Sequence, residues 1–60
     1  MKSVEQQIED MIHVLAESLK DANKHDNGNN AAGGRVRKVL QGIATQCKEL
    51  RKQVQQDRAA

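Results

Sequence analysis

The chain has 60 residues, and a domain of this size buries only a small part of its surface, so we expect one domain at most and a need for a partner. It contains no Phe, Tyr or Trp, which excludes recognition of unpaired bases by aromatic stacking. Its formal net charge of +2 is too small to indicate a polyanionic partner by itself.

The charges are distributed unevenly along the chain. Residues 1–30 carry three Lys or Arg against six Asp or Glu, which gives this half a net charge of −3. Residues 31–60 carry seven Lys or Arg against two Asp or Glu, which gives a net charge of +5. The two halves are therefore opposite in charge, and the distribution says more than the total.

The first predicted element is an amphipathic helix over about residues 3–24. Its apolar residues recur at steps of three and four, as on one stripe of an α-helix: Val4, Ile8, Met11, Ile12, Leu15, Leu19 and Ala22. Ser3 and Gln6 have the spacing of a capping box, in which each side chain bonds a free backbone N–H at the helix start. The helix should therefore begin near Ser3.

The segment of about residues 25–30 is predicted to be the connecting turn. It contains no apolar residue and is rich in Asn, Asp and Gly, which accept left-handed backbone angles or bond their own backbone. Gly28 is expected to end the first helix, and Asn29 or Asn30 to cap the second.

The second helix is predicted over about residues 31–57. Its seam has spacings of four and three without interruption: Val36, Leu40, Ile43, Cys47, Leu50 and Val54. Val39 and Ala44 widen this seam, as in a bundle rather than a narrow two-stranded coiled coil. We expect Cys47 to be a small buried apolar residue, because a reactive thiol needs a cationic, accessible setting.

Three glycines interrupt the pattern of the second helix. Gly33 and Gly34 have two interpretations. The first is structural, a loose first turn or a close contact between helices; the second is a place where a phosphate approaches backbone amides. Gly42 lies opposite the seam, where it either weakens the helix or clears space for a partner's backbone.

These elements predict an all-α fold, an antiparallel two-helix hairpin that makes residues 1–60 a single domain. Each helix of a hairpin shields only part of the other's apolar stripe. We therefore expect a homo-oligomer, either a dimer that forms a four-helix bundle or a higher assembly.

Several kinds of site are excluded by spacing. His13, His25 and Cys47 do not have the spacing of metal ligands, and the carboxylates lie at solvent-facing helical positions. No Gly-rich phosphate loop is present. We therefore expect no enzyme, no catalytic residue, no metal, no cofactor and no small-molecule substrate.

The single cysteine favours a reducing compartment, and the chain shows neither a signal peptide nor a membrane-spanning run. We therefore expect a cytoplasmic protein with no membrane partner.

On a helical wheel the cations of the second helix gather on one flank. Arg37, Lys48 and Lys52 face outward and Lys38 extends their flank, whereas Arg35 lies on the other side of the seam and Arg51 borders the core. One interpretation is a surface that contacts nucleic-acid phosphates. The alternative is a protein-interaction or assembly module in which these cations balance the acidic first helix.

Two stretches carry a resemblance to a known family. Gly28 through Lys38 reads Gly-Asn-Asn-Ala-Ala-Gly-Gly-Arg-Val-Arg-Lys, and Lys48 through Val54 reads Lys-Glu-Leu-Arg-Lys-Gln-Val. With the acidic first helix, they resemble the bacterial linker-histone-like family, the chlamydial-type histone-like nucleoid proteins, over about residues 4–56.

This resemblance implies binding of double-stranded DNA without sequence preference, and compaction or bridging of DNA in the nucleoid. The cations that match the family's are Arg35, Arg37, Lys38, Lys48, Arg51 and Lys52. Longer members carry a Lys- and Ala-rich carboxyl tail, whereas this chain stops at Arg58-Ala59-Ala60 and resembles a short form. Its affinity for DNA is therefore expected to be weak.

Overall fold

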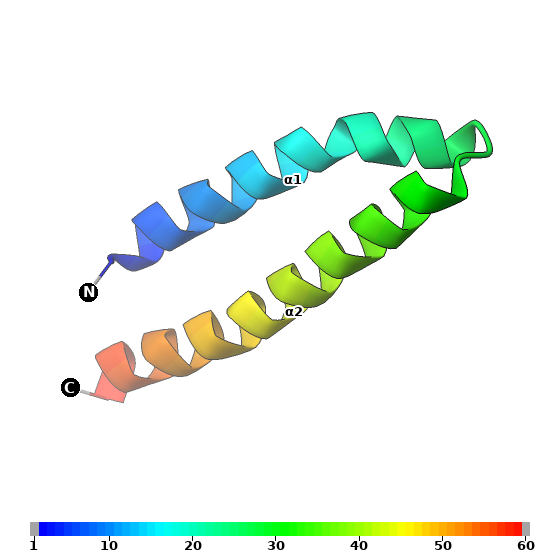
Figure 1. The fold of residues 1–60 in the computed structure, drawn as a ribbon. Helices are drawn as coiled ribbons and strands as arrows, with labels where there is room; N and C mark the ends of the chain where they lie inside the picture. The colour runs from blue at the N-terminus through cyan, green and yellow to red at the C-terminus, as the bar shows by residue number, and fades with distance from the viewer. Residues whose placement is uncertain (1, 60) are drawn as a thin grey trace.

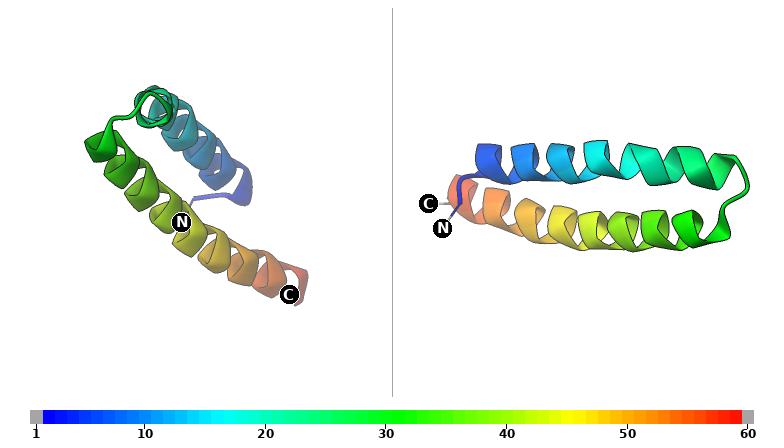
Figure 2. Two further views of the ribbon diagram at one scale, coloured as in Figure 1. Left: turned by 90° about the vertical axis from the view of Figure 1, so that its right-hand side faces the viewer. Right: turned by 45° about the horizontal axis from the view of Figure 1, so that its top comes forward.

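The computed structural model describes residues 2–59 as two antiparallel helices. Helix α1 runs over Val4–Asp26 and helix α2 over Asn30–Ala59. The helices lie side by side, and the first turn of α1 and the last turn of α2 are at the same end (Figures 1 and 2). The predicted all-α hairpin is confirmed for the described residues, and the molecule measures 49 × 15 × 15 Å.

Ser3 caps the start of α1, as the sequence predicted. Its Oγ accepts a hydrogen bond from the backbone N–H of Gln6 at 3.1 Å. The Gln6 side chain donates to Oδ1 of Asp10 at 3.0 Å, on the next turn of the helix. The Gln6 side chain therefore points forward along the helix. Of the two hydrogen bonds in the predicted capping box, the one accepted by Ser3 is observed.

The turn is shorter than the predicted residues 25–30, because His25 and Asp26 belong to α1 and Asn30 to α2. Gly28 has a φ of 96°, the left-handed conformation that glycine adopts most readily after a helix. Asn29 then caps α2, accepting at its Oδ1 from the backbone N–H of Ala32 at 3.0 Å. Three residues reverse the chain because these two positions satisfy the helix ends directly.

Gly33 and Gly34 are both helical, and they lie in different surroundings. A Cβ at Gly33 would be 2.9 Å from Cε1 of His25, closer than real Cβ contacts. Gly33 therefore allows the close contact between helices that was one of its two interpretations. Gly34 and Gly42 have nothing within 4 Å of a Cβ position.

The hairpin encloses a very small core. Among the described residues, Ala32 is fully buried and Leu50 is 8% exposed, while every other side chain is more exposed. The prediction that Cys47 is buried is wrong: Cys47 is exposed, because a single neighbouring helix does not cover the whole width of the seam. Ile12, Leu19 and Leu40 are each more than half exposed.

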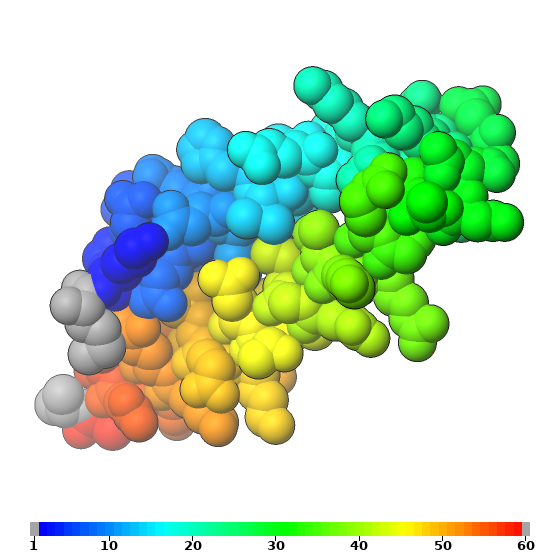
Figure 3. Space-filling view, in the orientation of Figure 1, coloured from blue at the N-terminus to red at the C-terminus, as the bar shows by residue number. Residues whose placement is uncertain are grey.

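The two long edges of the hairpin differ. One edge is polar and carries the hydrogen bond of 2.8 Å between Gln7 and Gln53 and the ion pair of Asp21 with Arg35. The other edge is apolar and is described below. Side chains fill the space between the ribbons (Figure 3). Within residues 2–59, neither helix is long and apolar enough to cross a membrane.

Candidate nucleic-acid interface

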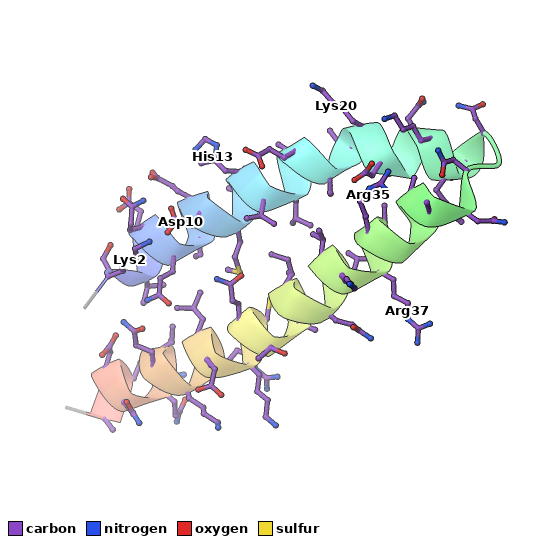
Figure 4. All side chains as sticks on the ribbon, in the orientation of Figure 1. Lys2, Asp10, His13, Lys20, Arg35 and Arg37 are labelled. Atoms are coloured by element: carbon purple, nitrogen blue, oxygen red, sulfur yellow. The ribbon has the colours of Figure 1, made fainter. Side chains whose placement is uncertain are left out.

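The outer face of α2 carries most of the chain's predicted phosphate contacts. At 100° per residue, Arg37, Lys48 and Lys52 lie within about 40° of the direction opposite Leu50, and Lys38 lies about 60° away. All four side chains are exposed, and Arg37 points away from α1 (Figure 4). We call these four residues the basic face.

The basic face extends along half of α2. At a rise of 1.5 Å per residue, the fifteen steps from Arg37 to Lys52 span about 22 Å. The helix fixes the order and spacing of the four cations, which spread over about 100° of its outer surface. Such an extended band of positive charge suits an extended polyanion better than a single small anion.

Arg51 lies beside the basic face rather than on it. A shallow hollow of about 460 Å³ is lined by Lys48, Arg51, Lys52 and Gln55. Three cations therefore border one depression near the carboxyl end of α2. Gln55 has no charge, and for that reason counting charges along the sequence did not single it out, although its wheel position coincides with that of Arg37.

Arg35 has a different role from the other five predicted contacts. Its guanidinium donates from two nitrogens to Asp21 of α1, at 2.9 and 3.1 Å (Figure 4). The hydrogen bond from Arg35 lowers the pKa of Asp21, and the same bond raises the pKa of Arg35. This bidentate pair links α2 to α1 at the polar edge, so Arg35 is engaged by its own hairpin even though its side chain is 53% exposed.

The remaining cations of the predicted site are largely unpaired. Within residues 2–59, Arg37, Lys38, Lys48 and Arg51 have no carboxylate oxygen within 4.0 Å. Lys52 lies 3.7 Å from Glu49 of its own helix, with both side chains well exposed. Such exposed pairs are weak and exchange readily with water or another anion.

The two helices therefore do not neutralise each other. Asp21 with Arg35 is the one ion pair that joins α1 to α2 in the described part of the chain. The pair of Lys2 with Asp10, at 2.7 Å, lies at the amino end, and the hydrogen bond from Lys2 is the main cause that lowers the pKa of Asp10. The outer cations of α2 are left free to meet an external partner.

The outer face of α1 has the opposite character. Glu5, Glu9 and Glu17 are exposed there together with Lys20 and Lys24, so this face is acidic on balance. His13 and Lys20 point away from α2 (Figure 4). A polyanion that approaches the hairpin is thus attracted more strongly to the outer face of α2 than to that of α1.

Among residues 2–59, no three His, Cys, Asp or Glu side chains come together as metal ligands. The chemistry that the basic face offers is the electrostatic binding of anions.

The model of a protein family described as histone H1-like protein Hc1 matches residues 5–60. The chain belongs to this family. The match confirms the resemblance seen in Gly28 through Lys38 and in Lys48 through Val54, and it indicates a histone-like DNA-binding protein of the nucleoid, from a family that is non-enzymatic. Comparisons with curated proteins and with solved structures gave no match.

Proposed function

We propose that this member of the Hc1 family binds duplex DNA by laying the basic face, together with Arg51, against backbone phosphates. The observation that carries the proposal is a row of exposed cations on α2 that face away from α1 and lack partners on it. Arg35, the sixth cation predicted from the sequence, is assigned to the hairpin's own ion pair instead.

The mechanism is electrostatic. Each Lys or Arg that neutralises a phosphate releases a condensed counterion, and the resulting gain in entropy favours binding at low salt. The span of about 22 Å corresponds to roughly six base pairs at 3.4 Å per pair, so one hairpin occupies a short stretch of duplex. Phosphate contacts carry no sequence information, and the binding is therefore proposed to be without sequence preference.

Compaction of DNA in the cytoplasmic nucleoid requires more than one binding surface in one particle. A single hairpin has one basic face, and the opposite helix is acidic on its outer side. Compaction or bridging is therefore proposed for a homo-oligomer, in which two basic faces are joined.

The alternative, an interaction module whose acidic and basic helices match each other, receives less support from the contacts. Such a match requires several ion pairs between the helices, and Asp21 with Arg35 is the one found in residues 2–59.

A salt titration of DNA binding tests the proposal. The variant Arg37→Glu/Lys48→Glu/Lys52→Glu reverses three cations of the basic face. Its matched control, Lys2→Glu/Lys20→Glu/Lys24→Glu, makes the same change in net charge on the α1 side of the hairpin. Circular dichroism must first show that both variants keep the helical content of the wild type.

Losing three phosphate contacts is expected to reduce the slope of log K against log salt by about 2.7, at about 0.9 per contact. The control is expected to keep a slope close to that of the wild type and to lose less affinity. Equal losses in the two variants would contradict the assigned face. A wild type that does not retard duplex DNA at about 50 mM salt, where such contacts are strong, would contradict DNA binding itself.

A further inference from the structure

One long edge of the hairpin exposes a continuous apolar surface. A groove of about 530 Å³ is lined from both helices, by Ile8 and Met11 of α1 and by Cys47, Leu50 and Val54 of α2 among others. Nearer the turn, a second hollow of about 380 Å³ is lined by Val36, Leu40 and Ala44 among others.

The large exposed side chains of α1 continue the same surface. On the wheel, Ile12, Leu15 and Leu19 lie within about 40° of Ile8, which lines the groove. Together we call the following residues the apolar face: Ile8, Ile12, Leu15, Leu19, Leu40, Cys47 and Val54.

The apolar face is bordered by opposite charges on its two sides. On α1, Glu5 and Glu9 are exposed at about 20° and 60° outward from Ile12. On α2, Arg51 lies about 20° outward from Leu40 and also lines the groove, and Arg58 shares the wheel position of Leu40 near the carboxyl end. At the open end the surface is thus an apolar strip with acidic residues on its α1 side and basic residues on its α2 side.

We propose that a second copy of this chain covers the apolar face, related by a two-fold axis parallel to the helices, so that the turns of both copies lie at the same end. The hairpin measures 49 × 15 Å along this side, a footprint of about 740 Å². That is close to the roughly 800 Å² per partner of stable interfaces. The core of one hairpin, Ala32 and Leu50, is too small to stabilise it without such a partner.

The charged edges select this axis over the alternative. A two-fold axis parallel to the helices places α1 of each copy over α2 of the other, and the acidic edge of one copy meets the basic edge of its partner. A two-fold axis across the helices places α1 over α1 and α2 over α2, and edges of like charge then meet.

The positions of these charged residues along the helix axes also agree with the parallel axis. Gln7 is level with Gln53, since their side chains are hydrogen-bonded at 2.8 Å. Arg51 is therefore level with the α1 segment that carries Glu5 and Glu9, and a parallel axis keeps each residue at its own height.

The same-end dimer has a consequence for DNA. Each basic face points away from its own α1, and the parallel axis carries the second basic face to the opposite side of the dimer. Such a particle can join two duplexes, whereas the other arrangement would place both faces on one side. This last step rests on the proposed function; the dimer itself does not.

Sedimentation of the protein without DNA tests the dimer independently of DNA binding. The wild type is expected at twice the chain mass of 6.7 kDa. Ile12→Gln/Leu19→Gln changes two exposed residues of the apolar face, and Val14→Gln is the control, because Val14 is 42% exposed but lies about 160° from Ile12 on the wheel. The dimer dissociation constant of the double variant is expected to be at least tenfold higher than that of the control. A monomeric wild type, or equal behaviour of the two variants, overturns the proposal.

Cysteine cross-linking tests the arrangement while the dimer stays intact. In the background Cys47→Ala, the pair Glu9→Cys/Arg51→Cys is expected to give a covalent dimer with a short bismaleimide, and neither single variant is expected to do so. A link within one chain would leave it at monomer mass on a denaturing gel, so it is told apart from the covalent dimer. A double variant that sediments as a dimer but does not cross-link overturns the same-end arrangement.

Discussion

At the turn end of the hairpin, Asn29 caps α2 and Ala32 is fully buried. Toward the open end, Leu50 is the one buried side chain among the described residues, and it lies beside a groove of about 530 Å³. The turn end is also held by close packing of Gly33 against His25 and by the bidentate ion pair of Arg35. Its geometry is set by contacts within the chain.

The open end depends on fewer contacts between the helices. The hydrogen bond between Gln7 and Gln53 joins them there, while Lys2 with Asp10 lies within the α1 side. The contrast shows that the bend of this protein is specified locally, and that the separation of the helix ends is left to packing. A partner copy therefore has most to contribute at the open end.

Removing the buried side chain of the open end should have the largest effect. Leu50→Ala is expected to lower the free energy of unfolding by about 2 kcal/mol or more, because it leaves a cavity and loses apolar burial. Val14→Ala, at a side chain 42% exposed, is expected to cost less than half as much. Urea denaturation followed by circular dichroism measures both, and equal losses would contradict the view that Leu50 dominates the core.

The two adjacent glycines at the turn end should respond differently to alanine. Gly34→Ala is expected to stabilise the protein by about 1 kcal/mol, because the position is helical and open. Gly33→Ala is expected to gain less or to destabilise, since the new methyl group must displace the His25 ring. In the background His25→Ala the two substitutions should become similar. If the difference between them persists there, His25 is not its cause.

The smallest expected effect is on the stability of the protein at low pH. The hydrogen bond from Arg35 lowers the pKa of Asp21 below its usual 3.8, so the carboxylate contributes stability above pH 3.8 that is lost as the pH falls through the lowered value. Asp21→Asn is expected to remove this part of the acid sensitivity. Asp10→Asn should remove the corresponding part at the amino end, where Lys2 lowers the pKa of Asp10. Thermal melts between pH 5 and pH 2 compare the two, and unchanged acid sensitivity in Asp21→Asn would contradict the role of its ion pair.

Much of the hairpin follows from local sequence. Ser3, Gly28 and Asn29 act where their residue types predict, because caps and left-handed turns depend on the nearest few residues. The exposure of Cys47 did not follow, since an unbroken heptad seam does not tell how much of it one neighbouring helix covers.

The predicted phosphate contacts show the same limit. Arg35 and Arg37 are two residues apart in the same motif, yet one is bonded to α1 and the other faces away from it. Local charge gives no means of separating them, because the difference depends on Asp21, fourteen residues earlier in the chain. The position of Arg35 on the side of the helix away from the cluster was the available signal.

The first turn of α1 and the last turn of α2 lie at the same end of the hairpin (Figures 1 and 2). In the same-end dimer all four of these helix ends would gather at one pole of the particle. A short flexible linker from the end of one copy to the start of another would then tether the pair without crossing either basic face. Assembly would become intramolecular, and DNA bridging could be studied at protein concentrations where separate chains come apart.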